Sequence, residues 1–194
     1  LTVFPLTPQD RIAGVLPLFH SFGYTVTQWL PLVGGWGVMY HPNPIEAKAI
    51  GDLIQKYRGT LLLATPTFCG MYARKCTKEQ FATLRYVIVG AEKVRETMRQ
   101  EFLDAFGLEM LEGYGCTEMG PVVSVNIPGF VEGKEVQTGN KPGTVGMPLP
   151  GVDEHAAVQP HEDAPAARHQ AEPGGADARQ PRDRLRCDPQ LADN

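Results

Sequence analysis

The first 125 residues show two kinds of hydrophobic pattern, one typical of strands and one typical of helices, and their alternation indicates an α/β fold. Short, almost wholly apolar runs, typical of buried strands, alternate with stretches in which apolar residues recur every three or four positions, as in helices. The predicted strands cover residues 13–16, 37–40, 61–64, 84–89, 108–111 and 121–125, and the predicted helices cover residues 21–32, 44–58, 67–75 and 94–106. Strands this apolar predict a partly parallel sheet with helices on both faces.

The second predicted helix carries the clearest boundary signals. Asn43 can cap its amino terminus, Pro44 suits the first helical position, and Glu46 stands three residues after the cap. We expect Gly59 to end this helix and Gly107 to end the fourth one, because glycine readily adopts the left-handed conformation found at helix ends.

Composition divides the chain at Val152. Residues 1–152 carry equal numbers of acidic and basic side chains, whereas residues 153–194 carry nine acidic and five basic ones and account for the net charge of −4. The second stretch has no aromatic residue and few large aliphatic ones, so it buries too little apolar surface to offset the entropy of ordering. We therefore expect a partial domain over residues 1–152 and a disordered tail over residues 153–194. An out-of-frame reading of GC-rich DNA would produce the same abrupt change.

Charge and cysteine content argue against several classes of protein. Neither part of the chain has an excess of positive charge, so no nucleic-acid partner is expected. The four cysteines form no C-x-x-C pair, which argues against a disulfide framework or a metal knuckle and fits a reducing, cytoplasmic compartment. Residues 12–45 contain no charged side chain, but prolines and glycines interrupt this run. We therefore expect a buried interior and no transmembrane span.

Candidate chemistry follows the fifth predicted strand, in the segment Glu-Gly-Tyr-Gly-Cys-Thr-Glu at residues 112–118. Its two glycines are expected to let a short loop turn sharply and approach a ligand closely. The Tyr114 ring can stack on a purine, Thr117 can donate to a phosphate oxygen, and Glu118 can reach a magnesium ion that bridges phosphates. The segment therefore predicts a nucleotide site. The alternative is an ordinary turn whose tyrosine packs against the core.

Two further polar segments follow predicted strands. Gly90, Ala91 and Glu92 follow the fourth strand, and His20 follows the first. Because parallel strands end at the same edge of a sheet, where ligands bind in such folds, we expect these segments and the one at Tyr114 to converge on one site. A lone histidine in an apolar stretch is otherwise more often a core residue.

Four ordered motifs resemble the adenylate-forming, or AMP-binding, enzyme superfamily. The motifs are Leu-Pro-Leu-Phe-His-Ser-Phe-Gly at residues 16–23, Leu-Arg-Tyr-Val-Ile-Val-Gly-Ala-Glu-Lys at 84–93, Gly-Tyr-Gly-Cys-Thr-Glu at 113–118 and Lys-Pro-Gly-Thr-Val-Gly at 141–146. Within the superfamily they are most similar to fatty acyl ligases, among them the acyl-[acyl-carrier-protein] synthetase half of 2-acylglycerophosphoethanolamine acyltransferase. The resemblance extends from about Pro8 to Val152 and implies a piece of the large N-terminal domain.

The resemblance implies a reaction and its partners. Such enzymes activate a carboxylic acid with ATP and magnesium to an acyl-adenylate, release pyrophosphate, and pass the acyl group to a thiol. The implied substrate is a fatty acid, and the implied acceptor is acyl carrier protein or CoA, in fatty acid and phospholipid metabolism. For the full-length protein the implied location is the cytoplasm, at the inner face of the membrane.

The resemblance also implies the roles of individual residues. Those expected to contact the nucleotide are Gly90, Ala91, Glu92, Tyr114, Gly115 and Thr117. Those expected in catalysis are His20, beside the acyl carboxylate, Thr117, at the α-phosphate, and Glu118, as the magnesium ligand. We expect residues 19–36 and the helix after Pro66 to form an apolar slot for the acyl chain.

Parts of the family pattern have no counterpart in these 194 residues. In the family, a phosphate-binding loop precedes the matching segment, and a ribose-binding aspartate, a hinge and a small domain with a catalytic lysine follow it. No lysine occurs after Lys141. Two alternatives therefore stay open: a truncated, non-catalytic nucleotide-binding remnant, and an adenylation domain that uses a different acid.

We predict that the 194-residue chain alone does not adenylate fatty acids. Without the amides and the cation that hold the β- and γ-phosphates, the pyrophosphate charge that develops loses stabilisation worth roughly 3 kcal/mol per missing group. ATP–pyrophosphate exchange with the purified chain measures this activity. Exchange above background would contradict the prediction.

Overall fold

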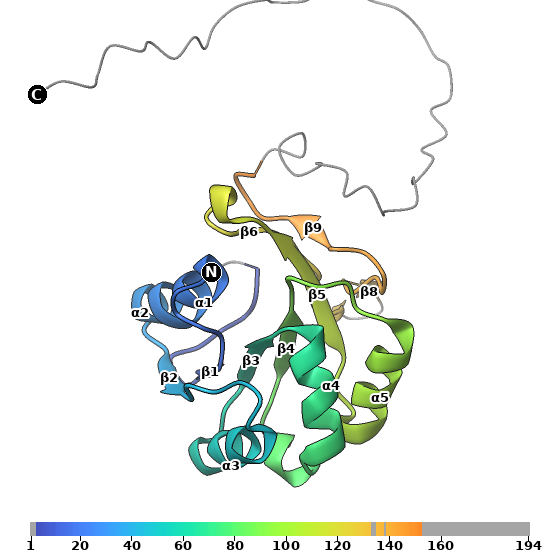
Figure 1. Cartoon of the computed structure of the whole chain (residues 1–194). Coiled ribbons are helices and arrows are strands. Elements are labelled where there is room, and N and C mark those ends of the chain that lie inside the picture. The colour runs from blue at the N-terminus through green and yellow to red at the C-terminus, as the bar shows by residue number, and fades with distance from the viewer. Residues whose placement is uncertain (1–2, 133–134, 138, 153–194) are drawn as a thin grey trace, which may run out of the picture. The chain divides into compact units, whose positions relative to one another are not determined.

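The computed structural model describes residues 3–132, 135–137 and 139–152; the predicted tail at residues 153–194 lies outside them. One mixed sheet has the strand order β2-β1-β3-β4-β5-β6-β9, and β7 and β8 form a separate hairpin (Figure 1). The strands are β1 (Arg11–Gly14), β2 (Gly37–Tyr40), β3 (Leu61–Ala64), β4 (Tyr86–Val89), β5 (Met110–Gly115), β6 (Val122–Val125), β7 (Phe130–Glu132), β8 (Glu135–Gln137) and β9 (Met147–Pro148). The strands from β2 to β5 pair in parallel, whereas β6 and β9 are antiparallel to their neighbours.

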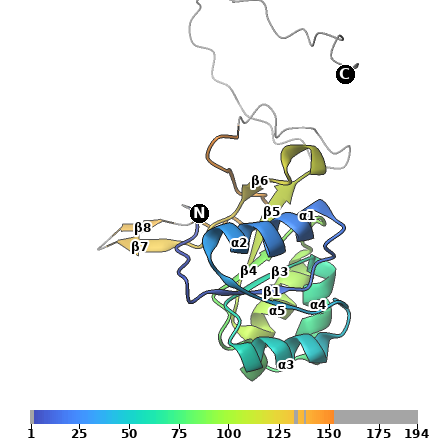
Figure 2. The ribbon, with the colours of Figure 1, turned by 90° about the vertical axis from the view of Figure 1, so that its left-hand side faces the viewer.

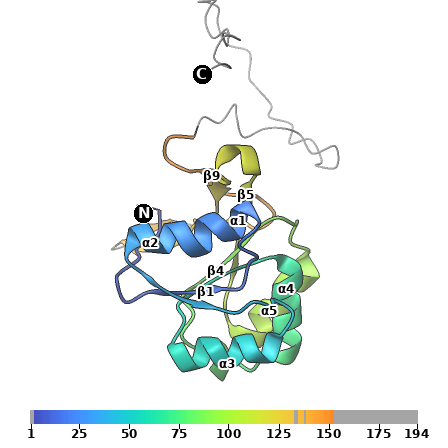
Figure 3. The ribbon, with the colours of Figure 1, turned by 60° about the vertical axis from the view of Figure 1, so that its left-hand side comes forward.

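Helices cover both faces of the sheet, as predicted (Figures 2 and 3). A continuous helical segment of α1 (Ser21–Gly23), the π-helix η1 (Tyr24–Trp29) and α2 (Leu30–Gly34) lies on one face. The other face carries α3 (Ala47–Tyr57), α4 (Pro66–Lys75) and α5 (Glu96–Phe106), and the short 3-10 turns are η2 (Glu79–Phe81) and η3 (Thr117–Met119).

The alternation of side chains along β3 divides the core between these two faces. Leu61 and Leu63 pack with Val26 of the π-helix, whereas Leu62 packs with Phe102 and the other apolar residues beneath α3, α4 and α5. The predicted α/β class is therefore confirmed. Strand β3, inside the parallel part, is buried along its whole length, whereas the edge strand β2 leaves Gly37 and Tyr40 exposed.

Helix α3 begins three residues later than predicted because Asn43 does not cap it. The Asn43 Nδ2 atom donates to Glu46 Oε1 at 2.7 Å, and Pro44 lies in a turn that precedes the helix. The two side chains expected to form a capping box therefore bond to each other. Glu46 occupies the cap position, and its side chain makes no capping hydrogen bond.

The carboxyl end of α3 also differs from the prediction, whereas that of α5 agrees with it. Arg58, with φ of 54°, takes the left-handed conformation expected of Gly59. Gly59 follows with its amide bonded to the Ile54 carbonyl, and a Cβ atom there would lie 2.8 Å from Met39 Cε. In α5 the left-handed residue is Gly107, as predicted.

The helix predicted over residues 21–32 is observed, continues to Gly34, and is π-helical in its middle. The Thr27 hydroxyl donates to the Gly23 carbonyl at 2.7 Å, and the Tyr40 hydroxyl donates to the Thr27 carbonyl at 2.7 Å. Side chains thus satisfy backbone oxygens along the π-helical stretch. Within the described ranges, no helix combines the length and the apolar character needed to cross a bilayer.

An ion pair between the buried Asp10 and the partly exposed Arg85 fixes the start of β1. The Asp10 carboxylate is only 2% exposed; its two oxygens accept hydrogen bonds from Arg85 Nη1 at 2.8 and 2.9 Å, and one also accepts from the Thr7 amide at 2.7 Å. Burial by itself raises the pKa of Asp10, but the hydrogen bond from the Thr7 amide and the Arg85 guanidinium outweigh it, so the pKa lies below its usual value. The pair contributes to stability only while Asp10 is ionised.

We predict that Asp10→Asn destabilises the fold by roughly 1–2 kcal/mol at neutral pH and that this difference shrinks in acid. Because the folded pKa is depressed, the contribution is complete above the unfolded value of about 3.9 and is lost as pH falls through the folded value. Urea unfolding at pH 7 to 2 measures it, with the exposed Asp104→Asn variant as control. A penalty for Asp10→Asn that stays constant over this range would contradict the assignment.

Candidate functional site

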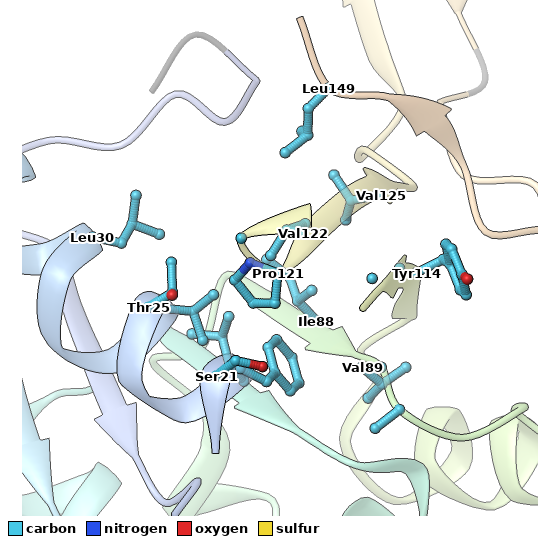
Figure 4. Close-up of a pocket in the computed structure, with 18 of the residues that line it drawn as sticks. Ser21, Thr25, Leu30, Ile88, Val89, Tyr114, Pro121, Val122, Val125 and Leu149 are labelled. Carbon is cyan, nitrogen blue, oxygen red and sulfur yellow. The ribbon is translucent and has the colours of Figure 1, made fainter. Parts of the chain in front are cut away.

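A pocket of about 620 Å³ lies at the carboxyl ends of the parallel strands, between the sheet and the helical segment that begins at Ser21 (Figure 4). The lining of this pocket includes seven of the eight predicted site residues: His20, Gly90, Ala91, Tyr114, Gly115, Thr117 and Glu118. These residues follow β1, follow β4, or lie on and after β5. The convergence expected from the strand order is therefore observed, whereas the roles of the residues stay predictions.

The interior of the pocket is apolar. The helical side contributes Val26 and Leu30, and the sheet contributes Leu61, Leu63 and Ile88. The polar predicted residues, among them Thr117 and Glu118, lie at the strand ends. The pocket thus joins a polar rim to an apolar interior.

Only one of the two segments expected to line an acyl slot contributes to the pocket, and the binding of an acyl chain stays a prediction. The segment 19–36 does contribute to the pocket, although Phe19 itself is 93% exposed and lies outside the lining. Helix α4, which follows Thr65, contributes no lining residue because it packs against the opposite face of the sheet. Strand β3 lines the pocket where α4 was expected to do so. Every residue of this strand is buried, and because alternate side chains point to opposite faces, half of them face the pocket.

The segment around Tyr114 is a strand, so the prediction of a glycine-hinged loop is wrong. Strand β5 continues through Gly113 and Tyr114 to Gly115, pairs with β6, and has a register shift after Tyr114. Neither glycine has a positive φ. A Cβ atom on Gly115 would lie 1.9 Å from the Pro121 carbonyl oxygen, and one on Gly113 would lie 3.0 Å from the Ser124 carbonyl oxygen. The glycines therefore allow the backbone of the neighbouring strand to come close.

Tyr114 lies on the α5 side of β5. Alternate residues of a strand share a face, so Tyr114 points to the same side as Glu112, which pairs with Arg99 of α5. In Figure 4 the Tyr114 ring points away from Ser21 and Thr25, which lie on the helical wall. The half-buried ring thus borders one side of the pocket rim.

Glu112 anchors this part of the site. Its buried carboxylate pairs with Arg99 and accepts a hydrogen bond from the Gly143 amide at 3.1 Å. Its backbone oxygen accepts from Asn126 Nδ2 at 3.1 Å, and the same Nδ2 atom donates to the Thr144 carbonyl at 2.6 Å. These contacts fasten the segment that contains Gly143 and Thr144 to β5. The sequence offered no signal for them beyond the presence of the fourth motif.

His20 is exposed and caps α1, so it is not a core histidine. Its Nδ1 atom accepts a hydrogen bond from the Phe22 amide at 3.2 Å. This bond requires an unprotonated Nδ1, which leaves the proton of the neutral ring on Nε2. In this tautomer the Nε2–H group of His20 is a donor at the pocket, and a carboxylate is a suitable acceptor.

Thr117 and Ser21 connect two walls of the pocket. The Ser21 Oγ atom lies 3.0 Å from Thr117 Oγ1, and either can be the donor. Sequence reasoning gave Ser21 no role, although it follows His20 directly. Glu118 is the exposed residue after Thr117, and no group of three metal-ligating side chains occurs among the described residues. A magnesium ion at Glu118 would therefore take its other ligands from phosphates and water, which is its usual mode of binding.

The turn after β4 is held in an uncommon backbone conformation. Ala91 has φ of 69°, and the Gly90 amide donates to the Ala64 carbonyl at 3.3 Å. Glu92 lies outside the pocket lining, and its Oε2 atom accepts the Thr67 hydroxyl of α4 at 2.5 Å. This bond ties the turn to the amino end of α4, and the contact of Glu92 with a nucleotide stays a prediction.

Comparisons with known proteins agree with the resemblance found in the sequence. The AMP-binding enzyme family matches residues 1–171. The long-chain-fatty-acid–CoA ligase of Bacillus subtilis (strain 168) is 28% identical over 157 residues, which cover 79% of this chain and 26% of that protein. The p-hydroxybenzoic acid–AMP ligase FadD22 of Mycobacterium marinum is 25% identical over 116 residues, which cover 59% of this chain and 16% of that protein.

Solved structures show the same fold. ATP-bound MatB from Rhodopseudomonas palustris superimposes with a TM-score of 0.65 at 26% sequence identity, covering 77% of this chain and 28% of that chain. The chain therefore spans no more than 28% of the length of any of these three proteins.

We predict that Gly115→Ala destabilises the fold by about 2 kcal/mol or more, because its methyl group meets the carbonyl of Pro121, the residue just before β6. Gly37→Ala is the matched control: in the edge strand β2, a Cβ atom would lie 3.4 Å from the flexible Arg11 side chain. Chemical denaturation of both variants measures the difference. Equal stabilities would show that β6 moves aside without cost.

Proposed function

Since the chain belongs to the AMP-binding enzyme family, we propose that it forms the acid- and nucleotide-binding part of an enzyme that joins a fatty acid to AMP. The observation that carries this proposal is the pocket with a polar rim and an apolar interior. A fatty acid divides in the same way, into a carboxylate and a hydrocarbon chain. Its carboxylate end then lies near the strand ends, where a nucleotide binds in folds of this class.

The rim residues supply groups that suit the nucleotide and the carboxylate. The Tyr114 ring stacks on adenine, the Thr117 hydroxyl donates to the α-phosphate, and the backbone at Gly90 and Ala91 borders the base. The Nε2–H group of His20 orients the carboxylate. In the reaction a carboxylate oxygen attacks the α-phosphorus, and pyrophosphate leaves with the electrons of the broken P–O bond. The acyl group then passes to a thiol, and AMP is released.

The exposed Glu118 carboxylate fits a magnesium ion that is shared with phosphates, since magnesium commonly takes one or two carboxylates and completes its shell with phosphate oxygens and water. When bound, such an ion screens the phosphate charge that repels an incoming carboxylate. Glu118 holds the ion in this proposal.

Long-chain acids are the substrates we favour. The apolar interior can bury a hydrocarbon chain, whose transfer from water is worth about 0.8 kcal/mol per methylene. Two relatives are named long-chain-fatty-acid–CoA ligases, from Bacillus subtilis and Yersinia pestis. We propose CoA or acyl carrier protein as the thiol acceptor, fatty acid and phospholipid metabolism as the context, and the cytoplasm as the location.

A different acid is the second candidate, and one observation favours it. FadD22 of Mycobacterium marinum is named a p-hydroxybenzoic acid–AMP ligase, and a pocket lined by Phe22 and Trp36 also suits an aromatic ring. Substrate profiling of a full-length protein that contains this segment separates the two. A preference for an aromatic acid, acetate or an amino acid over long-chain acids would overturn the fatty acid assignment.

We predict that the chain binds AMP and that Tyr114→Ala weakens this binding about tenfold or more, because stacking on an aromatic ring is worth about 1–3 kcal/mol per base. Isothermal titration calorimetry measures the affinity. Tyr57→Ala is the control, since Tyr57 ends helix α3 and lies outside the pocket lining. Wild-type affinity in Tyr114→Ala would refute the stacking role, and no AMP binding by the wild-type chain would refute the nucleotide site.

A further inference from the structure

We propose that Ser21 is a positioning residue for the phosphate group of the ligand. In this proposal Ser21 donates its hydroxyl proton to Thr117 Oγ1, and Thr117 in turn donates its own proton outward to the α-phosphate. The inference rests on the proposed function, because it requires a nucleotide phosphate at Thr117.

The two hydroxyl groups come from two different elements that line the pocket. Ser21 is the first residue of α1, and Thr117 is the first residue of the turn η3. Both line the pocket, and their oxygens lie 3.0 Å apart although 96 positions separate them in the chain. The contact therefore depends on the tertiary fold.

The chemistry of hydroxyl groups fixes the direction of this hydrogen bond once a phosphate is present. A hydroxyl has one proton to donate and two lone pairs that accept, whereas an ionised phosphate oxygen only accepts. If Thr117 gives its proton to the phosphate, its oxygen can only accept from Ser21. A chain of two hydrogen bonds then runs from Ser21 through Thr117 to the phosphate. Such chains polarise and strengthen each other.

Local contacts hold the backbone on which each of the two hydroxyl groups stands. The Phe22 amide bonds to His20 Nδ1 and thereby fixes the first turn of α1. Gly23 packs so closely on the preceding segment that a Cβ atom would lie 2.2 Å from the Pro17 carbonyl oxygen. On the other wall, the Gly120 amide donates to the Thr117 carbonyl at 3.3 Å. Ser21 therefore reduces the freedom of the Thr117 hydroxyl without ligand contact of its own.

The test compares AMP with adenosine, which lacks the phosphate, on the complete 194-residue chain. We expect Ser21→Ala to weaken AMP binding about three- to tenfold, the effect of one hydrogen bond, and to leave adenosine binding unchanged. Ser21→Thr keeps the hydroxyl and is expected to restore AMP affinity. In a Thr117→Val background, Ser21→Ala is expected to have no further effect.

Two controls separate this role from a structural one. Thr83→Ala removes a hydroxyl that donates to the Gly59 carbonyl at 2.7 Å, away from the pocket, and should not affect either ligand. Circular dichroism checks that each variant is folded. If Ser21→Ala does not fold, Ser21→Cys takes its place, because its thiol has a similar shape and is a weaker donor.

The outcomes distinguish this inference from the proposed function. AMP binding that depends on Thr117 but not on Ser21 would overturn the inference and leave the function intact. Equal losses for AMP and adenosine, or additive losses in the double variant, would also overturn it, because Ser21 would then only shape the pocket. A wild-type chain that binds neither ligand, or that binds AMP no better than adenosine, would overturn both.

Discussion

The arrangement of the site depends on the interactions of the buried Glu112 carboxylate. A charge removed from water is tolerated only with close partners, and here Arg99 and the Gly143 amide provide them. Loss of one partner of such a pair typically costs about 3–5 kcal/mol, because the remaining charge stays buried. Glu112 thereby sets the position of β5 relative to α5 and to the segment around Gly143. Tyr114 is two residues further along this strand, so its place follows from that of Glu112.

At strand β5 the pairing in the sheet also changes from parallel to antiparallel. This strand pairs in parallel with β4 and antiparallel with β6, and the approach of β6 is possible because Gly115 has no side chain. The antiparallel pair brings Pro121 and Val122 into the pocket lining, beside residues from the parallel strands. The apolar interior thus has walls from both kinds of pairing, whereas the polar residues gather where the parallel strands end.

The sequence predicted the helices, the strands β1 to β6 and the convergence of the site because these follow from periodicity and strand order, whereas it gave no sign of β7, β8 and β9. The predictions were wrong where a residue type can play either of two structural roles. Glycine permits a positive φ and also removes a Cβ atom, and the pattern around Tyr114 could not show that Gly113 and Gly115 serve the second use. Asn43 can cap a helix or bond a neighbouring side chain, and it does the latter with Glu46. Pairing of side chains distant in the chain, such as Ser21 with Thr117, has no local signature.

The three site segments share one mode of support. His20 bonds the Phe22 amide, Glu92 bonds Thr67, and Glu112 pairs with Arg99. In each segment a predicted site residue, or in the case of Glu112 a residue close to one, is thus held by a hydrogen bond or an ion pair. Ala91 keeps a φ of 69° despite a cost of about 1–2 kcal/mol for a residue with a Cβ atom, and its neighbour Glu92 bonds to Thr67. In the proposed site, the hydroxyl donors and the Tyr114 ring are therefore held in place before a ligand binds. Positioning of this kind reduces the entropy lost on binding, which is how a fixed site gains affinity from few contacts.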